Sequence, residues 1–308
     1  LALQAGEVFM PTWGLAPAGD GQRTAVKQRP IDDFPVVDPL DGSRRDLAFL
    51  LDSRLYADGV VVLHNGRVVA ERYRNGLTPD KPRLLLEATR PLLNLLGAMS
   101  VSQGKLAADK SVIRYLPSLA VSTGLRKVAI QRLLENKEHH AWAPEEVNDW
   151  QRASGWIPNQ ANSGIRAWLS QSGRWEKPLD EREASLFSSS PDDDLLAWTL
   201  AESNAMPLSR LFCEQLLSRT KAEHPVLWVS DAQGVELASG LGLALRDFAK
   251  LGQLLVEARS SRSRAKIPGW FIETLTASSG VRSTEVKGLP TVVSGATVLC
   301  TWEDRGIV

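Results

Sequence analysis

The sequence predicts an α+β fold, in which an antiparallel sheet is flanked by helices and carries an inserted, mainly helical lobe. The order of the hydrophobic patterns leads to this class. Runs rich in β-branched residues lie at 58–73, at 226–239 and at 291–302, and the stretch between the first two holds apolar residues at helical spacing. The predicted parts are an N-terminal arm (1–45), a sheet lobe (46–85 and 225–308) and a mainly helical lobe (86–224).

The composition disfavours several classes of function. The 36 Lys and Arg residues balance the 36 Asp and Glu residues, so no overall electrostatic field attracts nucleic acid, and no nucleic-acid partner is expected. No stretch reaches the roughly 20 apolar residues of a membrane-spanning helix. No cofactor is expected either. The sequence starts at Leu1 rather than at Met, which leaves an exported and a cytoplasmic location both open.

The first firm element is a hairpin at 58–73. Residues 1–45 mix Gly, Pro and charged residues without sustained periodicity, which predicts an arm packed over the body. In the following segment, two β-branched runs flank Asn65-Gly66. Because Asn-Gly is the strongest short signal for a two-residue hairpin turn, the sheet is expected to begin here.

Residues 89–102 predict a buried helix. Thr89 can cap its start, Pro91 is tolerated in its first turn, Gly104 follows its end, and apolar residues occupy nearly every face. Further helices are expected over 192–203, 207–219, 244–258 and 268–277, a second hairpin over 226–239 and strand over 291–302.

Five of the ten tryptophans fall between residues 142 and 175. Such a group indicates either a satellite core or an aromatic-walled cleft, and the core is the favoured interpretation. Just before it, Glu138, His139 and His140 suggest a metal site, but adjacent histidines point apart on either regular element. A solvated loop without metal is therefore expected there.

The two cysteines, Cys213 and Cys300, lie far apart in the sequence. Cys213 belongs to an apolar helical run, which favours a buried free thiol. Whether the two cysteines pair stays open.

Four segments, taken in order, resemble the serine β-lactamase and penicillin-binding-protein superfamily, in the branch of class C β-lactamases and 6-aminohexanoate-dimer hydrolases. DGVVVLHNGRVVAERY resembles the strands before the family's nucleophile helix, and LLGAMSVSQGKLAADKSVIRYLPSL resembles that helix with its exit and loop. FSSSPDDDLLAWTLAES resembles the segment of the second motif, and DAQGVELASGLGLALRDFAKLGQLL resembles the turn and helix before the third. The resemblance covers most of residues 55–260 and implies a β-lactamase-like fold.

The first catalytic motif that this resemblance implies is S-x-x-K at the start of the nucleophile helix. It supplies a Ser nucleophile and, one helical turn later, a Lys that accepts its proton. The matching positions are Glu87 and Arg90. Because an arginine stays protonated at any usable pH, it cannot act as the general base, and this pair cannot run the family reaction.

The other two motifs also depart from the family pattern. A Tyr followed two residues later by Ser or Asn is expected where Ser188 and Ser190 stand, and an alkyl hydroxyl donates a proton far less readily than a phenol. A Lys or His before Thr or Ser and Gly matches Val293, Ser294 and Gly295, where the cation is missing. Three departures together predict a catalytically inactive homologue.

Three further S-x-x-K matches are expected to be coincidental, because a pattern with two free positions arises easily by chance. They are Ser102-Lys105 at the exit of the buried helix, Ser218-Lys221 at a helix end and Ser263-Lys266 in a Ser/Arg-rich loop.

Glu87 and Arg90 allow three interpretations. Their i, i+3 spacing suits an ion pair worth roughly 0.2–0.5 kcal/mol if it is exposed. Alternatively, the Glu87 carboxylate plugs the helix N-terminus where an oxyanion would otherwise bind. In the third interpretation, Arg90 binds a carboxylate ligand, with Ser188 and Ser294 as further ligand contacts.

The leading hypothesis is a catalytically inactive β-lactamase-like homologue whose cleft binds a small molecule, a peptide or a protein partner. The alternative is an active serine hydrolase of amides or esters that uses non-family residues such as Ser188 or Ser190, for which the sequence offers no nearby His or Lys as a base. A third hypothesis is a structural subunit whose cleft is filled by its own side chains.

Overall fold

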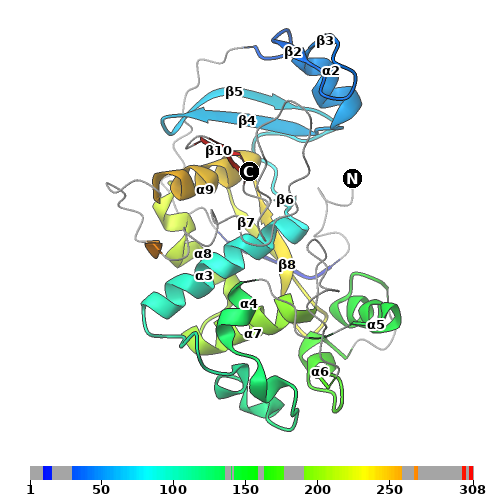
Figure 1. The fold of residues 1–308 in the computed structure, drawn as a ribbon, viewed down its shortest axis with the longest axis vertical. Coiled ribbons are helices and arrows are strands. Elements are labelled where there is room, and N and C mark those ends of the chain that lie inside the picture. Colours follow the sequence, from blue (N-terminus) through cyan, green and yellow to red (C-terminus); the bar gives the residue numbers. More distant parts are fainter. Residues whose placement is uncertain are drawn as a thin grey trace.

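The computed structural model describes residues 10–15, 30–135, 140, 142–158, 163–176, 191–258, 267–269, 300–302 and 305–307. Across them, helices and antiparallel strands combine in an α+β arrangement, so the predicted fold class is confirmed (Figure 1). The strands are β1 (Thr12–Leu15), β2 (Pro35–Val37), β3 (Arg44–Asp46), β4 (Gly59–His64), β5 (Arg67–Tyr73), β6 (Arg83–Leu84), β7 (Val226–Ser230), β8 (Glu236–Leu243), β9 (Cys300–Trp302) and β10 (Arg305–Ile307).

The helical elements follow the same numbering. The α-helices are α2 (Leu47–Phe49), α3 (Arg90–Ser102), α4 (Ile130–Leu134), α5 (Pro144–Ser154), α6 (Ile165–Leu169), α7 (Pro191–Asn204), α8 (Leu208–Gln215) and α9 (Leu245–Ala258). A short π-helix, η2 (Leu50–Arg54), is also present. The short 3-10 helices are η3 (Leu86–Thr89), η4 (Val112–Arg114), η5 (Pro117–Leu119), η6 (Leu125–Lys127) and η7 (Leu217–Arg219).

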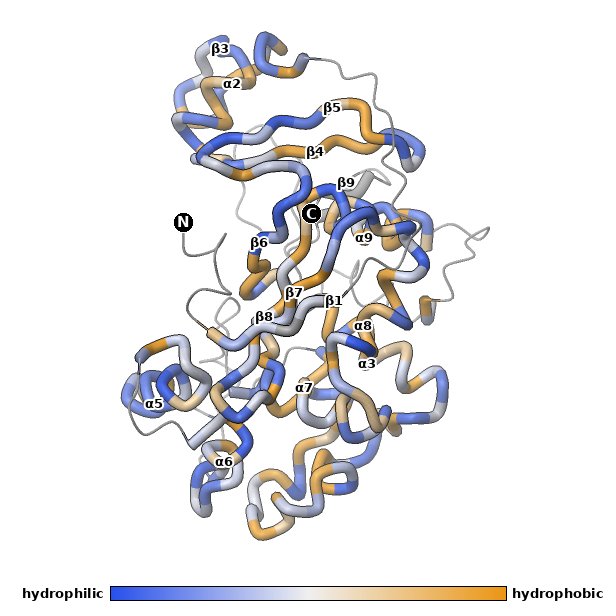
Figure 2. The backbone as a smooth tube through the Cα atoms, turned by 180° about the vertical axis from the view of Figure 1, so that it is seen from behind, coloured by the Kyte–Doolittle hydropathy of each residue, from blue (hydrophilic) through white to orange (hydrophobic). Residues whose placement is uncertain are grey.

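A four-stranded antiparallel sheet in the order β1-β7-β8-β6 runs through the middle of the molecule (Figure 2). Residues of the expected arm form its edge strand β1, which pairs with β7, and β6 pairs with β8. Trp228 of β7 is fully buried, donates its Nε1–H to the carbonyl of Leu237 at 2.8 Å, and packs edge-on against Phe212 of α8. The sheet therefore joins segments from both ends of the helical region.

The hairpin predicted at 58–73 is confirmed as β4 and β5, which pair in a separate two-stranded sheet. Its turn residues Asn65 and Gly66 have φ of 50° and 73°, and two positive φ values are what a type I′ hairpin turn needs. The buried Arg72 of β5 forms ion pairs with Asp32 at 2.8 Å and Asp52 at 2.5 Å. These pairs hold the segment before the hairpin against it.

The buried helix predicted at 89–102 is confirmed as α3, in which residues 92–100 are all buried. Gly97 lets α4 approach closely, because a Cβ at this position would lie 2.2 Å from Cδ2 of Leu134. On another side α3 meets α7, where Asn204 donates from Nδ2 to Oγ of Ser100 at 3.1 Å. The predicted cap at Thr89 is wrong: Thr89 has helical φ and ψ and makes no capping bond, because η3 leads directly into α3.

The tryptophan-rich segment forms core, as favoured from the sequence: Trp150, Trp168 and Trp175 are each 3% exposed. The solvated loop expected around His140 is wrong for that residue, which is 1% exposed and packs against Trp142, with 4.1 Å between the ring centres and a tilt of 47°. An imidazole between indole rings gains packing that a loop in water would lack. His139 and Glu138 lie outside the described residues.

The helices predicted at 192–203, 207–219 and 244–258 and the hairpin at 226–239 are present as α7, α8 with η7, α9, and β7 with β8. The C-terminal predictions fall mostly outside the described residues, apart from 267–269 and the strand β9. Cys213 is a half-buried free thiol, as favoured from its sequence context, and burial raises its pKa to about 11. Within the described part of the chain, every helix is too short or too polar to cross a bilayer.

Candidate functional site

Glu87 and Arg90, the two positions predicted to match the first motif, lie where η3 runs into α3. Arg90, the first residue of α3, reaches α7 and forms an ion pair with Asp193, with 2.9 Å between Nε and Oδ1. Both side chains are largely buried, at 14% and 9% exposed. The charge of the Arg90 guanidinium is therefore compensated from within the protein.

Glu87 lies in a different environment from Arg90. It is exposed in η3, and although both residues are described, no ion pair joins it to Arg90. The i, i+3 pair expected from the sequence is therefore wrong, because the buried Asp193 carboxylate takes the guanidinium instead. The exposure of Glu87 also gives no support to the interpretation of its carboxylate as an internal plug.

The backbone just before Glu87 is strained. Leu86 has φ of 49°, in the left-handed region that non-glycine residues seldom adopt. Its neighbour Leu85 donates its N–H to the carbonyl of Leu241 in β8 at 2.8 Å. On the other side Thr89 is fully buried, and its Oγ1 makes no hydrogen bond among the described residues. Strain of this kind persists where the surrounding structure imposes it, and it gathers at functional sites.

Three consecutive buried aspartates, Asp192, Asp193 and Asp194, open α7. The sequence predicted them as a favourable helix start, which agrees with the positive end of the helix dipole, but their burial and partners could not be read from the pattern. The Asp194 carboxylate accepts hydrogen bonds from Nε1 of Trp150 at 2.7 Å and the backbone N–H of Ala238 at 2.8 Å. Burial raises the pKa of Asp194 to about 7.

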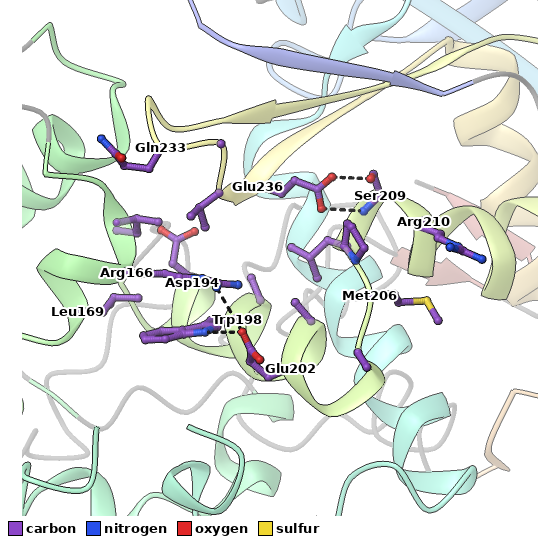
Figure 3. A pocket seen from close by; sticks show the side chains of 18 of the residues that line it. Arg166, Leu169, Asp194, Trp198, Glu202, Met206, Ser209, Arg210, Gln233 and Glu236 are labelled. Carbon is purple, nitrogen blue, oxygen red and sulfur yellow. Dashed lines mark hydrogen bonds and ion pairs between the residues drawn. The ribbon is translucent and has the colours of Figure 1, made fainter. Parts of the chain in front are cut away.

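A cavity of about 710 Å³ lies between α6, α7, the start of α8 and the turn from β7 to β8 (Figure 3). Asp194 lines it, whereas its neighbour Asp193 faces Arg90. Among the described residues that line the cavity, neither Glu87 nor Arg90 is found. The cavity is thus a separate feature on α7, and sequence reasoning missed it.

The remaining candidate residues are placed as follows. Ser188, Ser190, Val293, Ser294, Gly295 and the pair Ser263-Lys266 lie outside the described residues. Of the other two coincidental matches, Ser102 is exposed at the end of α3, and Ser218 donates its hydroxyl to the carbonyl of Glu214 at 2.8 Å. In the part of the chain that the structure describes, His, Cys, Asp and Glu form no cluster suited to a metal ion.

Comparison with known proteins supports the resemblance drawn from the sequence. A scan against protein-family models finds no match. The 6-aminohexanoate-dimer hydrolase of Paenarthrobacter ureafaciens is 22% identical over 312 aligned residues, which cover 96% of this chain and 78% of that protein.

Solved structures give the same result. A Bacillus anthracis protein provisionally named a 6-aminohexanoate-dimer hydrolase superposes with a TM-score of 0.74 at 22% identity, over 99% of this chain and 79% of that one. A Bacteroides dorei protein provisionally named a β-lactamase superposes with a TM-score of 0.52 at 16% identity, over 75% and 67%. The chain therefore has the β-lactamase-like fold of the serine β-lactamase and penicillin-binding-protein superfamily, as its sequence predicted.

Proposed function

We propose that this chain is a non-catalytic homologue of the β-lactamase-like hydrolases, which forms no acyl-enzyme and uses its retained cleft to bind a small molecule or peptide. The buried ion pair of Arg90 with Asp193 is the observation that carries the proposal. It stands where the family reaction needs a neutral amine to accept the proton of a nucleophilic hydroxyl.

The chemistry of the two positions supports this proposal. An arginine guanidinium stays protonated at any usable pH, so it supplies no base. The side chain at the nucleophile position, Glu87, has no hydroxyl and is hydrated rather than desolvated. Acyl transfer by the family route would need both groups to be replaced.

The ligand side of the proposal follows from the comparisons and from Arg90. Since the names of the relatives point to amide compounds, the 6-aminohexanoate dimer is a rational first ligand to test. Its carboxylate could share the Arg90 guanidinium with Asp193, with Ser188 and Ser294 as predicted further contacts. A ligand bound in this way would stay intact.

The test is intact-protein mass spectrometry after incubation with a fluorophosphonate probe and with a panel of β-lactams, beside an active family member. The proposal expects no added mass on this chain. A stoichiometric adduct would overturn it, and an adduct mapped to Ser188 or Ser190 would establish the alternative of an active serine hydrolase.

Thermal unfolding with the 6-aminohexanoate dimer tests the binding side. The dimer is expected to raise the midpoint of the wild-type protein and to have a smaller effect on Arg90→Lys, which keeps a charge but loses the planar fork of donors. Equal shifts in both proteins, or none in either, would count against Arg90 as a ligand contact.

A further inference from the structure

The residues that line the cavity between α6, α7 and α8 become more exposed along one face of α7. Asp194, Ala197 and Ala201 follow one another at spacings of three or four residues, so they share a face of the helix, and Ala205 lines the cavity just beyond the end of α7. The first two are buried, Ala201 is half-buried and Ala205 is exposed. At a rise of 1.5 Å per residue, the face runs for roughly 10 Å from a closed end at Asp194 to Ala201, and the mouth opens beside Ala205.

The walls of this cavity are held by buried polar contacts rather than by loose packing. Asp231, fully buried in the β7–β8 turn, accepts the backbone N–H of Ile165 at 2.8 Å and that of Val235 at 2.9 Å. This carboxylate ties the start of α6 to the turn opposite it. Opposite them, Ser209 at the start of α8 donates its backbone N–H to Glu236 at 3.0 Å, and its hydroxyl also bonds to Glu236. The cavity is therefore preformed, as small-molecule sites commonly are.

Most of the interior is apolar. The apolar side chains come from all four walls and are mostly small on α7, which leaves room for a ligand. They include Ile165, Leu169, Ala197, Ala201, Leu208 and Val235. A volume of about 710 Å³ falls within the roughly 300–1,000 Å³ typical of ligand pockets.

The charged groups that line the cavity are mainly acidic. Its two guanidinium groups are already neutralised, since Arg166 pairs with Glu202 at 3.2 Å and Arg210 pairs with Glu214 at 2.6 Å. By contrast, the groups that donate hydrogen bonds to Glu236 are the neutral backbone N–H and hydroxyl of Ser209 (Figure 3). The groups that donate to Asp194 are likewise neutral. A carboxylate held only by neutral donors favours a positive charge nearby.

The mouth has a feature that suits a cation as well. The guanidinium of Arg166 lies 5.1 Å from the centre of the Trp198 ring, and Glu202 accepts from Nε1 of that ring at 3.1 Å. An indole face beside a carboxylate is an arrangement that attracts organic cations. Here the protein's own arginine occupies it.

We propose that this cavity binds an organic ammonium ion whose apolar body lies along α7 and whose charged group is attracted by the carboxylate of Glu236. The proposal concerns a site apart from Glu87 and Arg90, so it stands or falls independently of the proposed loss of acyl chemistry. Apolar walls supply affinity for the body of the ligand, and the acidic lining selects its charge.

Isothermal titration calorimetry with three ligands of the same length, hexylammonium, 1-hexanol and hexanoate, tests the proposal. Hexylammonium is expected to bind most tightly and hexanoate not at all. In Glu236→Gln the affinity for hexylammonium should fall by about tenfold, the size of one lost charged contact, while that for 1-hexanol stays the same. Ala201→Leu, which fills the middle of the cavity, should remove binding of both.

The matched control is Glu257→Gln, which removes an exposed carboxylate from α9 without touching the cavity and should leave all affinities unchanged. Circular dichroism confirms that each variant is folded. The proposal is overturned if wild type binds none of the three ligands, if 1-hexanol or hexanoate binds as well as hexylammonium, or if Ala201→Leu binds normally.

Discussion

Arg90 and Asp193, which are 103 positions apart in the sequence, meet at 2.9 Å between the first turns of α3 and α7. This contact joins the last position of the first expected motif to a residue that follows the second, and it places a compensated charge between them. It is a structural tie, and under the proposed function it also leaves the site without a base.

Breaking this pair is expected to destabilise the fold. Arg90→Met leaves the Asp193 carboxylate buried without its cation, next to the carboxylates of Asp192 and Asp194, and should cost about 3–5 kcal/mol in the free energy of unfolding. The double variant Arg90→Met/Asp193→Leu should recover most of that loss, because no charge is then left uncompensated. Urea denaturation of the two single variants and the double variant measures the coupling; strictly additive effects would contradict it.

Acyl chemistry is expected to return when the two motif positions are restored. Glu87→Ser/Arg90→Lys rebuilds the nucleophile and base, but the Asp193 carboxylate holds the introduced lysine protonated. Adding Asp193→Asn should therefore raise the rate of fluorophosphonate labelling further. Mass spectrometry over time measures the labelling rate. We expect no labelling of wild type, slow labelling of the double variant and faster labelling of the triple variant. A folded triple variant without label would show that other replacements also prevent the reaction.

The contribution of Asp194 to stability is expected to fall as pH rises. Because burial raises its pKa to about 7 from an ordinary value of 3.8, the folded state binds an extra proton between about pH 4 and pH 7. The stabilisation is complete below pH 4 and is lost as pH approaches 7. Asp194→Asn, which stays neutral, should gain stability relative to wild type by at most about 1.4 kcal/mol per pH unit across this range.

Urea denaturation at pH 5, 6 and 7 checks the Asp194 prediction. Asp149→Asn, at an exposed position on α5, is the matched control and should follow the wild-type pH dependence. If Asp194→Asn also follows wild type, the buried carboxyl does not titrate in this range.

Gly97→Ala is expected to destabilise the protein although alanine favours helices. A Cβ at this position would meet Cδ2 of Leu134 at 2.2 Å, so α4 or its leucine must move. Overpacking of this kind costs typically 1–3 kcal/mol. Combining Gly97→Ala with Leu134→Ala should cost less than the sum of the two single variants, because the second change makes room for the first. A stabilised Gly97→Ala would contradict the close contact.

The elements of this fold could be predicted from local patterns, and its contacts could not. Asn65-Gly66 fixed the hairpin and the apolar stretch around Gly97 fixed α3, because turn chemistry and periodicity act over a few residues. The match of Glu87 and Arg90 to the first motif also came from the sequence. The partner of Arg90 lies far along the chain, and periodicity gives the face of a helix but not what covers it. The cavity left only one signal in the sequence, the spacing of Asp194, Ala197 and Ala201 on α7.

The left-handed turn at Leu86 has a backbone geometry that does not depend on the side chain at position 87. Its geometry is fixed by the hydrogen bond from Leu85 to β8 and by the buried Thr89. The neighbouring side chain of Glu87 is exposed and does not pack in the core. A side chain placed at position 87 would thus inherit a defined position at the head of a long buried helix. For protein engineering, position 87 is therefore a fixed backbone site at which a nucleophilic residue can be introduced without disturbing the core.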